Sequence, residues 1–207
     1  THFDFLNPTG DTKAVMDYFG VSGTPNQVMQ QMSGPVGQVF LAAQAVANNV
    51  SQAVSIRLAS GIDHHDDDWE DLHGEALMQG FNALSKLISF LKDTKDTQGK
   101  PLWERTLIVA SSEFARTPGI NSRGGRDHHL SSSCLVAGRG IKGDTIIGGT
   151  DATYTRELID PKTGATDGDM LLRPPDVHAT ILKAMGLNYE HLSNQNPTII
   201  DAMLVEP

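Results

Sequence analysis

The chain has 207 residues, of which 39% are hydrophobic and 20% charged, a composition typical of a folded globular protein with a sizeable core. The formal net charge of −9 argues against nucleic acid and anionic membranes as partners, because both attract basic surfaces. The single cysteine excludes an internal disulfide, and no apolar run reaches the roughly 20 residues that a membrane-spanning helix needs.

The first third of the chain predicts helices followed by a strand. Residues 1–53 are expected to form a peripheral lead-in, with one short helix over 12–18. A longer helix begins at Pro35, and its apolar residues recur three or four positions apart, which places them on one face. The β-branched run "AVSIRLAS" (53–60) then predicts a buried strand.

The remainder alternates helices and strands. A helix over 76–92 carries an apolar stripe made by Leu77, Phe81, Leu84, Ile88 and Leu91. Strands are predicted at 106–111 and 132–138 with a short fourth at 144–150, and the last helix spans 174–185. Strand, helix and strand in this order predict a right-handed crossover between parallel strands. We therefore expect a layered α/β sandwich around a mostly parallel sheet.

Polar side chains gather where these predicted strands end. The stretch "SGIDHHDDDWEDLH" (60–73) contains six acidic residues and three histidines, and Asp63 and His65 come directly after the first strand. Glu113 follows the second strand, and the loop "GGRDHH" (124–129) precedes the third. Ligands of open α/β sheets bind beyond the carboxyl ends of the strands, so these groups are expected to converge. Carboxylate oxygens together with imidazole nitrogens suit Zn²⁺ or Mn²⁺ better than Ca²⁺ or Mg²⁺.

Simpler explanations exist for several of these residues. Acidic side chains just before a helix stabilise the positive end of the helix dipole, which accounts for the five acidic residues from Asp66 to Asp71. His73 fits a metal ligand and a first-turn helix residue equally well. The Asp127–His129 group fits a metal site or a loop hydrogen-bond network. His178 fits a packing or surface position in an amphipathic helix.

Several other mechanisms are excluded by missing motifs. The sequence contains no Walker A loop, no G-x-G-x-x-G after a strand, no G-x-S-x-G and no H-E-x-x-H. The acidic cluster is not an EF-hand loop either, because its carboxylates are consecutive and the turn glycine is missing.

The motifs "GIDHH", "LIVASSEFARTP", "GGRDHH", "GGTD" and "PPDVHATILKAMGL" resemble the C-terminal half of an exported bacterial family, domain of unknown function 1501. That family is placed in the alkaline phosphatase and sulfatase-like superfamily. The resemblance covers residues 54–190, followed by a C-terminal tail at 191–207. It implies an incomplete alkaline phosphatase-like α/β sandwich, an exported periplasmic protein, and a chain that is a C-terminal fragment.

The resemblance also implies a function, namely the metal-dependent hydrolysis of small phosphate or sulfate esters. One metal would be held by Asp63, His65 and His128, and Glu113 would serve a second metal. The nucleophile is expected upstream of this chain. Phe114 stands where the superfamily has His or Asn, so a full second site is not predicted. Residues that compete as ligands, or that support the ligands, are His64, His73 and Asp127.

Two further features leave alternatives open. Arg116 and Arg126 are candidates for binding an anionic group through paired hydrogen bonds, or they form salt bridges within their loop. In the superfamily a metal-binding His comes four residues after the Asp, but Asp67 stands at that position here. This spacing and Phe114 also fit a non-catalytic exported binding or assembly module that keeps the fold with a degraded metal site. A third possibility is that the acidic cluster binds Ca²⁺ in a purely structural role.

Overall fold

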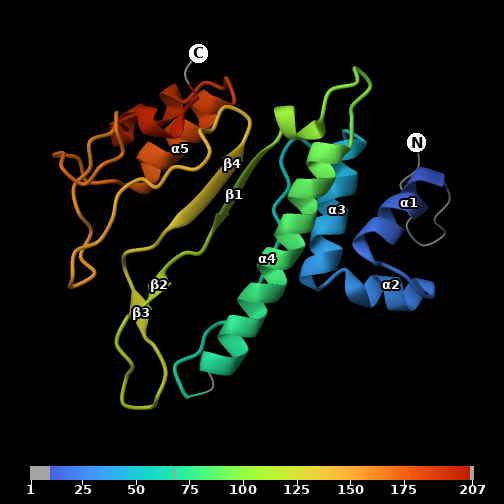
Figure 1. Cartoon of the computed structure of the whole chain (residues 1–207), viewed down its shortest axis with the longest axis horizontal. Coiled ribbons are helices and arrows are strands. Elements are labelled where there is room, and N and C mark those ends of the chain that lie inside the picture. The colour runs from blue at the N-terminus through green and yellow to red at the C-terminus, as the bar shows by residue number, and fades with distance from the viewer. Residues whose placement is uncertain (1–9, 68, 206–207) are drawn as a thin grey trace. The chain divides into compact units, whose positions relative to one another are not determined.

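The computed structural model describes residues 10–67 and 69–205 of the chain (Figure 1). The chain forms two compact units that do not follow the order of the sequence. The loop at 119–127 belongs to the first unit, although the residues on both sides of it belong to the second. The first unit comprises Thr1–Glu104 and Gly119–Asp127, and the second comprises Arg105–Pro118 and His128–Pro207.

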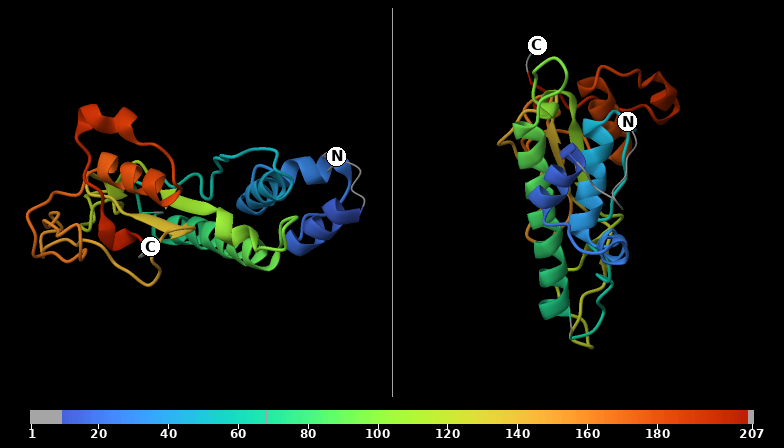
Figure 2. Two further views of the ribbon diagram at one scale, coloured as in Figure 1. Left: turned by 90° about the horizontal axis from the view of Figure 1, so that it is seen from above. Right: turned by 90° about the vertical axis from the view of Figure 1, so that its right-hand side faces the viewer.

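The first unit is built from helices. Proline occupies the first turn of two of them, where its missing N–H costs no hydrogen bond. Helices α3 and α4 lie side by side (Figures 1 and 2), and α1 packs against α3. The helices are α1 (Gly10–Phe19), α2 (Pro25–Gln31), α3 (Pro35–Ala47) and α4 (Trp69–Asp93), followed by the short 3₁₀ helix η1 (Leu102–Arg105).

Aromatic side chains from three helices form the core of this unit. The ring of Phe19 lies 6.4 Å from that of Phe40 and 5.5 Å from that of Phe90, measured between centroids. Such edge-on and tilted pairs are favourable beyond the apolar area that they bury. Phe40 lies on the face of α3 that is predicted to be apolar, and its side chain is buried as expected. In α4 the buried stripe differs from the predicted one, because Phe81 is 51% exposed while Leu87 is buried.

Helix α4 begins earlier than predicted, at Trp69 instead of Ala76. Glu70 and Asp71, expected just before the helix, lie in its first turn, where negative side chains also favour the positive end of the helix dipole. His73 is therefore a residue of the helix itself. Asp68, which was assigned the same role, lies outside the described residues.

The second unit contains the strands and the last long helix. Strand β1 pairs with β4 and strand β2 with β3, both pairs antiparallel. Ile200 and Met203 are buried near the C-terminus, and Val136 and Val177 pack against them. The elements are β1 (Leu107–Ser111), β2 (Ala115–Arg116), β3 (His128–His129), β4 (Cys134–Gly138), α5 (Pro174–Ala184), η2 (Glu190–Gln195) and η3 (Asp201–Met203).

The predicted sandwich with a mostly parallel sheet is wrong. In the part of the chain that the structure describes, the strands form two antiparallel two-stranded sheets. The predicted strand at 53–60 is not a strand; instead, the Leu58 carbonyl meets α4 at Gly80, where a Cβ would lie 2.5 Å from the Leu58 oxygen. Since residues 53–60 form no strand, the βαβ crossover expected from them is not formed, and β1 pairs with β4 in antiparallel orientation. The predicted strand at 144–150 is also absent, and only Thr150 forms an isolated bridge.

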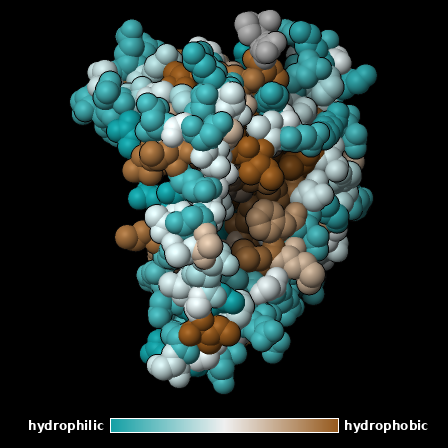
Figure 3. Space-filling model, turned by 60° about the vertical axis from the view of Figure 1, so that its left-hand side comes forward, coloured by the Kyte–Doolittle hydropathy of each residue, from teal (hydrophilic) through white to brown (hydrophobic). Residues whose placement is uncertain are grey.

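Apolar side chains reach the surface of the sheet formed by β1 and β4. Val109 is 47% exposed and Leu135 is 42% exposed. Successive side chains of a strand point to opposite faces of the sheet, so apolar side chains of these two strands point to both faces and these two stay partly exposed. Figure 3 shows hydrophobic groups among the hydrophilic residues of one face of the molecule. Among the described residues, none of the helices combines the length and apolar character needed to cross a membrane.

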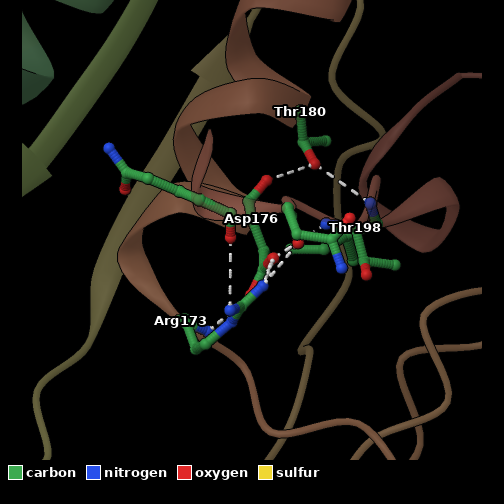
Figure 4. Close-up of polar contacts among 7 residues, drawn as sticks. Arg173, Asp176, Thr180 and Thr198 are labelled. Carbon is green, nitrogen blue, oxygen red and sulfur yellow. Dashed lines mark hydrogen bonds and ion pairs between the residues drawn. The ribbon is translucent and has the colours of Figure 1, made fainter. Parts of the chain in front are cut away.

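A buried carboxylate fastens the C-terminal segment to α5 (Figure 4). Asp176 is fully buried, and its carboxylate accepts hydrogen bonds from the Arg173 side chain at 2.8 and 3.0 Å and from the Thr198 N–H at 2.8 Å. Burial alone raises the pKa of Asp176, but the hydrogen bonds from Arg173 and Thr198 outweigh it and hold the pKa below its ordinary value. The Thr180 hydroxyl donates to the Asp176 carbonyl and accepts the Ile200 N–H.

Candidate metal centre

The loop at 121–127 docks on the start of the acidic cluster within the first unit. Asp66 and Gly124 form an antiparallel bridge, and the Arg126 N–H donates to the His64 carbonyl at 3.5 Å. An ion pair joins Arg123 Nε to Asp66 Oδ1 at 3.0 Å. Asp66, predicted to stabilise the helix start, therefore binds this loop. The two polar motifs of the sequence thus meet through their backbones.

Two glycines make this close approach possible. A Cβ on Gly125 would lie 2.1 Å from the His65 carbonyl carbon and 2.3 Å from the Asp66 nitrogen, so no side chain fits. Gly124 has a φ of +86°, in the left-handed region, and a Cβ there would lie 2.8 Å from the Cβ of Asp67. The "GG" of the motif is therefore required by the docking of the loop.

The docked loop places the imidazole of His65 between two carboxylates. His65 Nδ1 lies 3.0 Å from Asp127 Oδ1, and His65 Nε2 lies 3.1 Å from Asp63 Oδ1. An ionised carboxylate only accepts hydrogen bonds, and a neutral imidazole has one N–H, so His65 can donate to only one of its two carboxylate neighbours at a time. When Nδ1 donates to Asp127, the Nε2 lone pair faces Asp63.

Asn121 completes this arrangement, although no sequence motif singles it out. Its Nδ2 donates to the His65 carbonyl and to Asp127 Oδ1, both at 3.0 Å. The hydrogen bond with His65 and then that from Asn121 hold the pKa of Asp127 below its ordinary value, aided by the charge of nearby Arg123 and opposed by burial. The one sequence feature that could have pointed to Asn121 is the turn that follows it, because Asn side chains commonly accept hydrogen bonds from backbone N–H groups two residues further along the chain.

The donor atoms of Asp63 and His65 fit a divalent metal. Two ligand atoms at typical Zn–N and Zn–O distances are about 3.0–3.4 Å apart for angles near 90–110°, and the Asp63 Oδ1 to His65 Nε2 separation is 3.1 Å. Asp127 bonds the opposite nitrogen of the same ring. A carboxylate in that position fixes the tautomer and orientation of a metal-binding histidine.

The other predicted residues of the first unit pack against aromatic rings. His64 and His73 form an edge-on pair with centroids 5.7 Å apart, and His64 Nδ1 is buried without a hydrogen-bond partner among the described residues. The guanidinium carbon of Arg126 lies 4.2 Å from the centroid of the Trp69 ring, a cation–π contact at the start of α4. A role of these three residues as ligands or as an anion-binding group stays a prediction.

In the second unit, Phe114 packs against two predicted site residues. Its ring stacks on His128 at 3.8 Å with an interplanar angle of 22°, and the guanidinium carbon of Arg116 lies 5.3 Å from its centroid. The pairing of β2 with β3 sets Arg116 opposite His128. Phe114 thus supports its neighbours by packing. Glu113 is exposed, and its role and that of His128 as metal ligands stay predictions.

Comparison with known proteins identifies the family. The family model described as "Protein of unknown function (DUF1501)" matches residues 7–197, and the chain therefore belongs to this family. The family inferred from the motifs is thereby confirmed, and the match begins well before residue 54. A search of the curated proteins found no match, and neither did a search of the solved structures.

Proposed function

We propose that this protein binds a divalent metal ion, Zn²⁺ or Mn²⁺ in preference to Ca²⁺ or Mg²⁺, through Asp63 and His65. The observation that carries the proposal is the position of the His65 ring between two carboxylates, one on each nitrogen. In the tautomer whose Nδ1 donates to Asp127, the Nε2 lone pair and the Asp63 carboxylate face each other, and a cation between them would bind both. A mixed nitrogen and oxygen donor set favours these transition metals.

We further propose that the metal serves the hydrolysis of small phosphate or sulfate esters. Support comes from the resemblance of the motifs to the alkaline phosphatase and sulfatase-like superfamily, and export to the periplasm belongs to the same proposal. A bound metal would polarise the ester and offset charge that develops on its oxygens. Arg116 and Arg126 are the candidates for holding the anionic group. Ser112 is not proposed as the nucleophile, since its hydroxyl donates to the Phe114 carbonyl at 2.7 Å.

One observation favours a non-catalytic binding or assembly module as the second candidate. Phe114 occupies the position where the superfamily has a metal-binding His or Asn, and its ring stacks on His128. A protein with this substitution would bind metal at Asp63 and His65 without catalysing ester hydrolysis.

Metal binding and turnover on the full chain separate these candidates. We expect about one Zn²⁺ or Mn²⁺ per chain by elemental analysis, lost in Asp63→Asn and in His65→Gln. Asp11→Asn, which removes an acidic residue from the first turn of α1, is the matched control and should keep the metal. Stoichiometric metal without turnover of nitrophenyl phosphate or sulfate favours the module. A metal-free protein that also fails to bind added Zn²⁺ or Mn²⁺ refutes the proposed metal binding and the metal-dependent hydrolysis, and it favours a module whose metal site is degraded.

A further inference from the structure

The side chain of Asn121 uses both ends of its amide within the loop at 121–127. Its Oδ1 accepts the N–H groups of Arg123 at 2.9 Å and of Gly125 at 3.1 Å, which closes the turn. Its Nδ2 donates to the His65 carbonyl and to Asp127 Oδ1. The four partners fix the orientation of the amide, because the reverse orientation would set its oxygen against two oxygens.

We propose that Asn121 is a positioning residue for the metal centre, an inference that rests on the proposed metal binding by His65. One oxygen of Asp127 accepts from both the Asn121 amide and His65 Nδ1, so the carboxylate is fixed by two donors. The same amide also binds the backbone of His65. Asn121 therefore fixes both partners of the Asp127–His65 hydrogen bond and, through it, the direction in which Nε2 points.

The chemistry of this position requires an amide. A carboxylate has no donor, so aspartate at position 121 would lose both Nδ2 hydrogen bonds and place a second negative charge beside Asp127 Oδ1. Its oxygens could still accept the two N–H groups of the turn. Asn121→Asp (N121D) thus keeps the acceptors of the turn, removes the contacts with His65 and Asp127, and adds one negative charge beside Asp127.

The first experiment measures Zn²⁺ affinity of the full chain by calorimetry. We expect N121D to weaken Zn²⁺ binding about 10–100-fold, as is typical when the support of a metal-binding histidine is removed. Asn82→Asp, an exposed position in α4 with the same charge change, is the control and should stay within about twofold of wild type. An N121D affinity within twofold of wild type overturns the proposal. If N121D does not fold, Asn121→Ser removes both amide donors and takes its place.

Two further measurements distinguish positioning from a general loss of structure. Because Asn121 acts partly through Asp127 and partly through the His65 backbone, N121D combined with Asp127→Asn should weaken Zn²⁺ binding by less than the product of the two single losses, whereas fully additive losses contradict the inference. In metal-free protein, Asp127 and Asp63 compete for the proton of the neutral His65 ring, so nitrogen-15 NMR should show a larger share of the Nδ1-protonated tautomer in wild type than in N121D. Equal shares would overturn the inference. This spectrum tests the role of Asn121 even if no Zn²⁺ binds, so the failure of metal binding and that of the inference are separable.

Discussion

Replacing Gly125 with alanine should disrupt the metal centre from a position that holds no ligand. The added methyl carbon would lie 2.1 Å from the His65 carbonyl carbon, while non-bonded carbons prefer about 3.5–4.0 Å. The overlap is therefore about 1.4–1.9 Å. Because the obstructing atoms belong to the backbone of His65 and Asp66, no side chain can rotate away, and one of the two segments must move.

The consequences follow from that movement. The His65–Asp127 hydrogen bond has a length of 3.0 Å, so a displacement of about 1 Å takes it beyond hydrogen-bonding distance. Overpacking of this kind costs about 1–3 kcal/mol of folding free energy, and we expect the upper part of this range because the contact is with backbone. Loss of the oriented histidine should weaken Zn²⁺ binding by at least about tenfold.

Urea unfolding and Zn²⁺ calorimetry measure the two effects separately. Gly119→Ala is the control, since a Cβ at this position of the same segment would meet nothing within 4 Å. If Gly125→Ala unfolded at the wild-type urea concentration and bound Zn²⁺ like wild type, the close docking of the loop on His65 would be refuted.

Three further predictions concern stability. Asp176→Asn should lower the free energy of unfolding by about 3 kcal/mol at pH 7, because it leaves the Arg173 guanidinium without its buried partner; equal urea midpoints would contradict this. The folded pKa of Asp176 is lowered, so its contribution is fully present above the ordinary pKa of about 4 and is lost as pH falls through the folded value; the gap between wild type and variant should close over that range. Thr180→Val should cost about 1–3 kcal/mol by leaving the buried Ile200 N–H without its acceptor, seen as faster amide exchange at Ile200. Gly74→Ala in α4 should stabilise the protein by about 0.5–1 kcal/mol, because no atom lies within 4 Å of the new methyl group; a lower melting temperature would show that this turn of α4 is not helical.

Local sequence patterns were sufficient for much of the secondary structure. The spacing of apolar residues placed the helices now seen as α3, α4 and α5, although α4 begins earlier than predicted, and β-branched runs placed β1 and β4. The motifs identified the family. These features depend on residues a few positions apart, whose side chains share a face of one helix or strand.

The pairing of the strands was not predictable in the same way. The run at 53–60 has the composition of a buried strand, yet its backbone meets helix α4 at Gly80. A strand exists only if another strand accepts its hydrogen bonds, and the residues of the run do not specify that partner.

The same distinction between local sequence and long-range packing applies to the candidate metal centre. Asp63, His65 and Asp127 were recognisable from the sequence as metal-binding residue types in polar loops. Their geometry depends on contacts across the fold, since His65 and Asp127 are 62 positions apart and meet only because two glycines let the backbones approach closely. Asn121 has no local feature that marks its role, because its amide gains its partners only when the loop docks on His65. Periodicity and residue type thus indicate which side chains are available, while long-range backbone packing decides which of them meet.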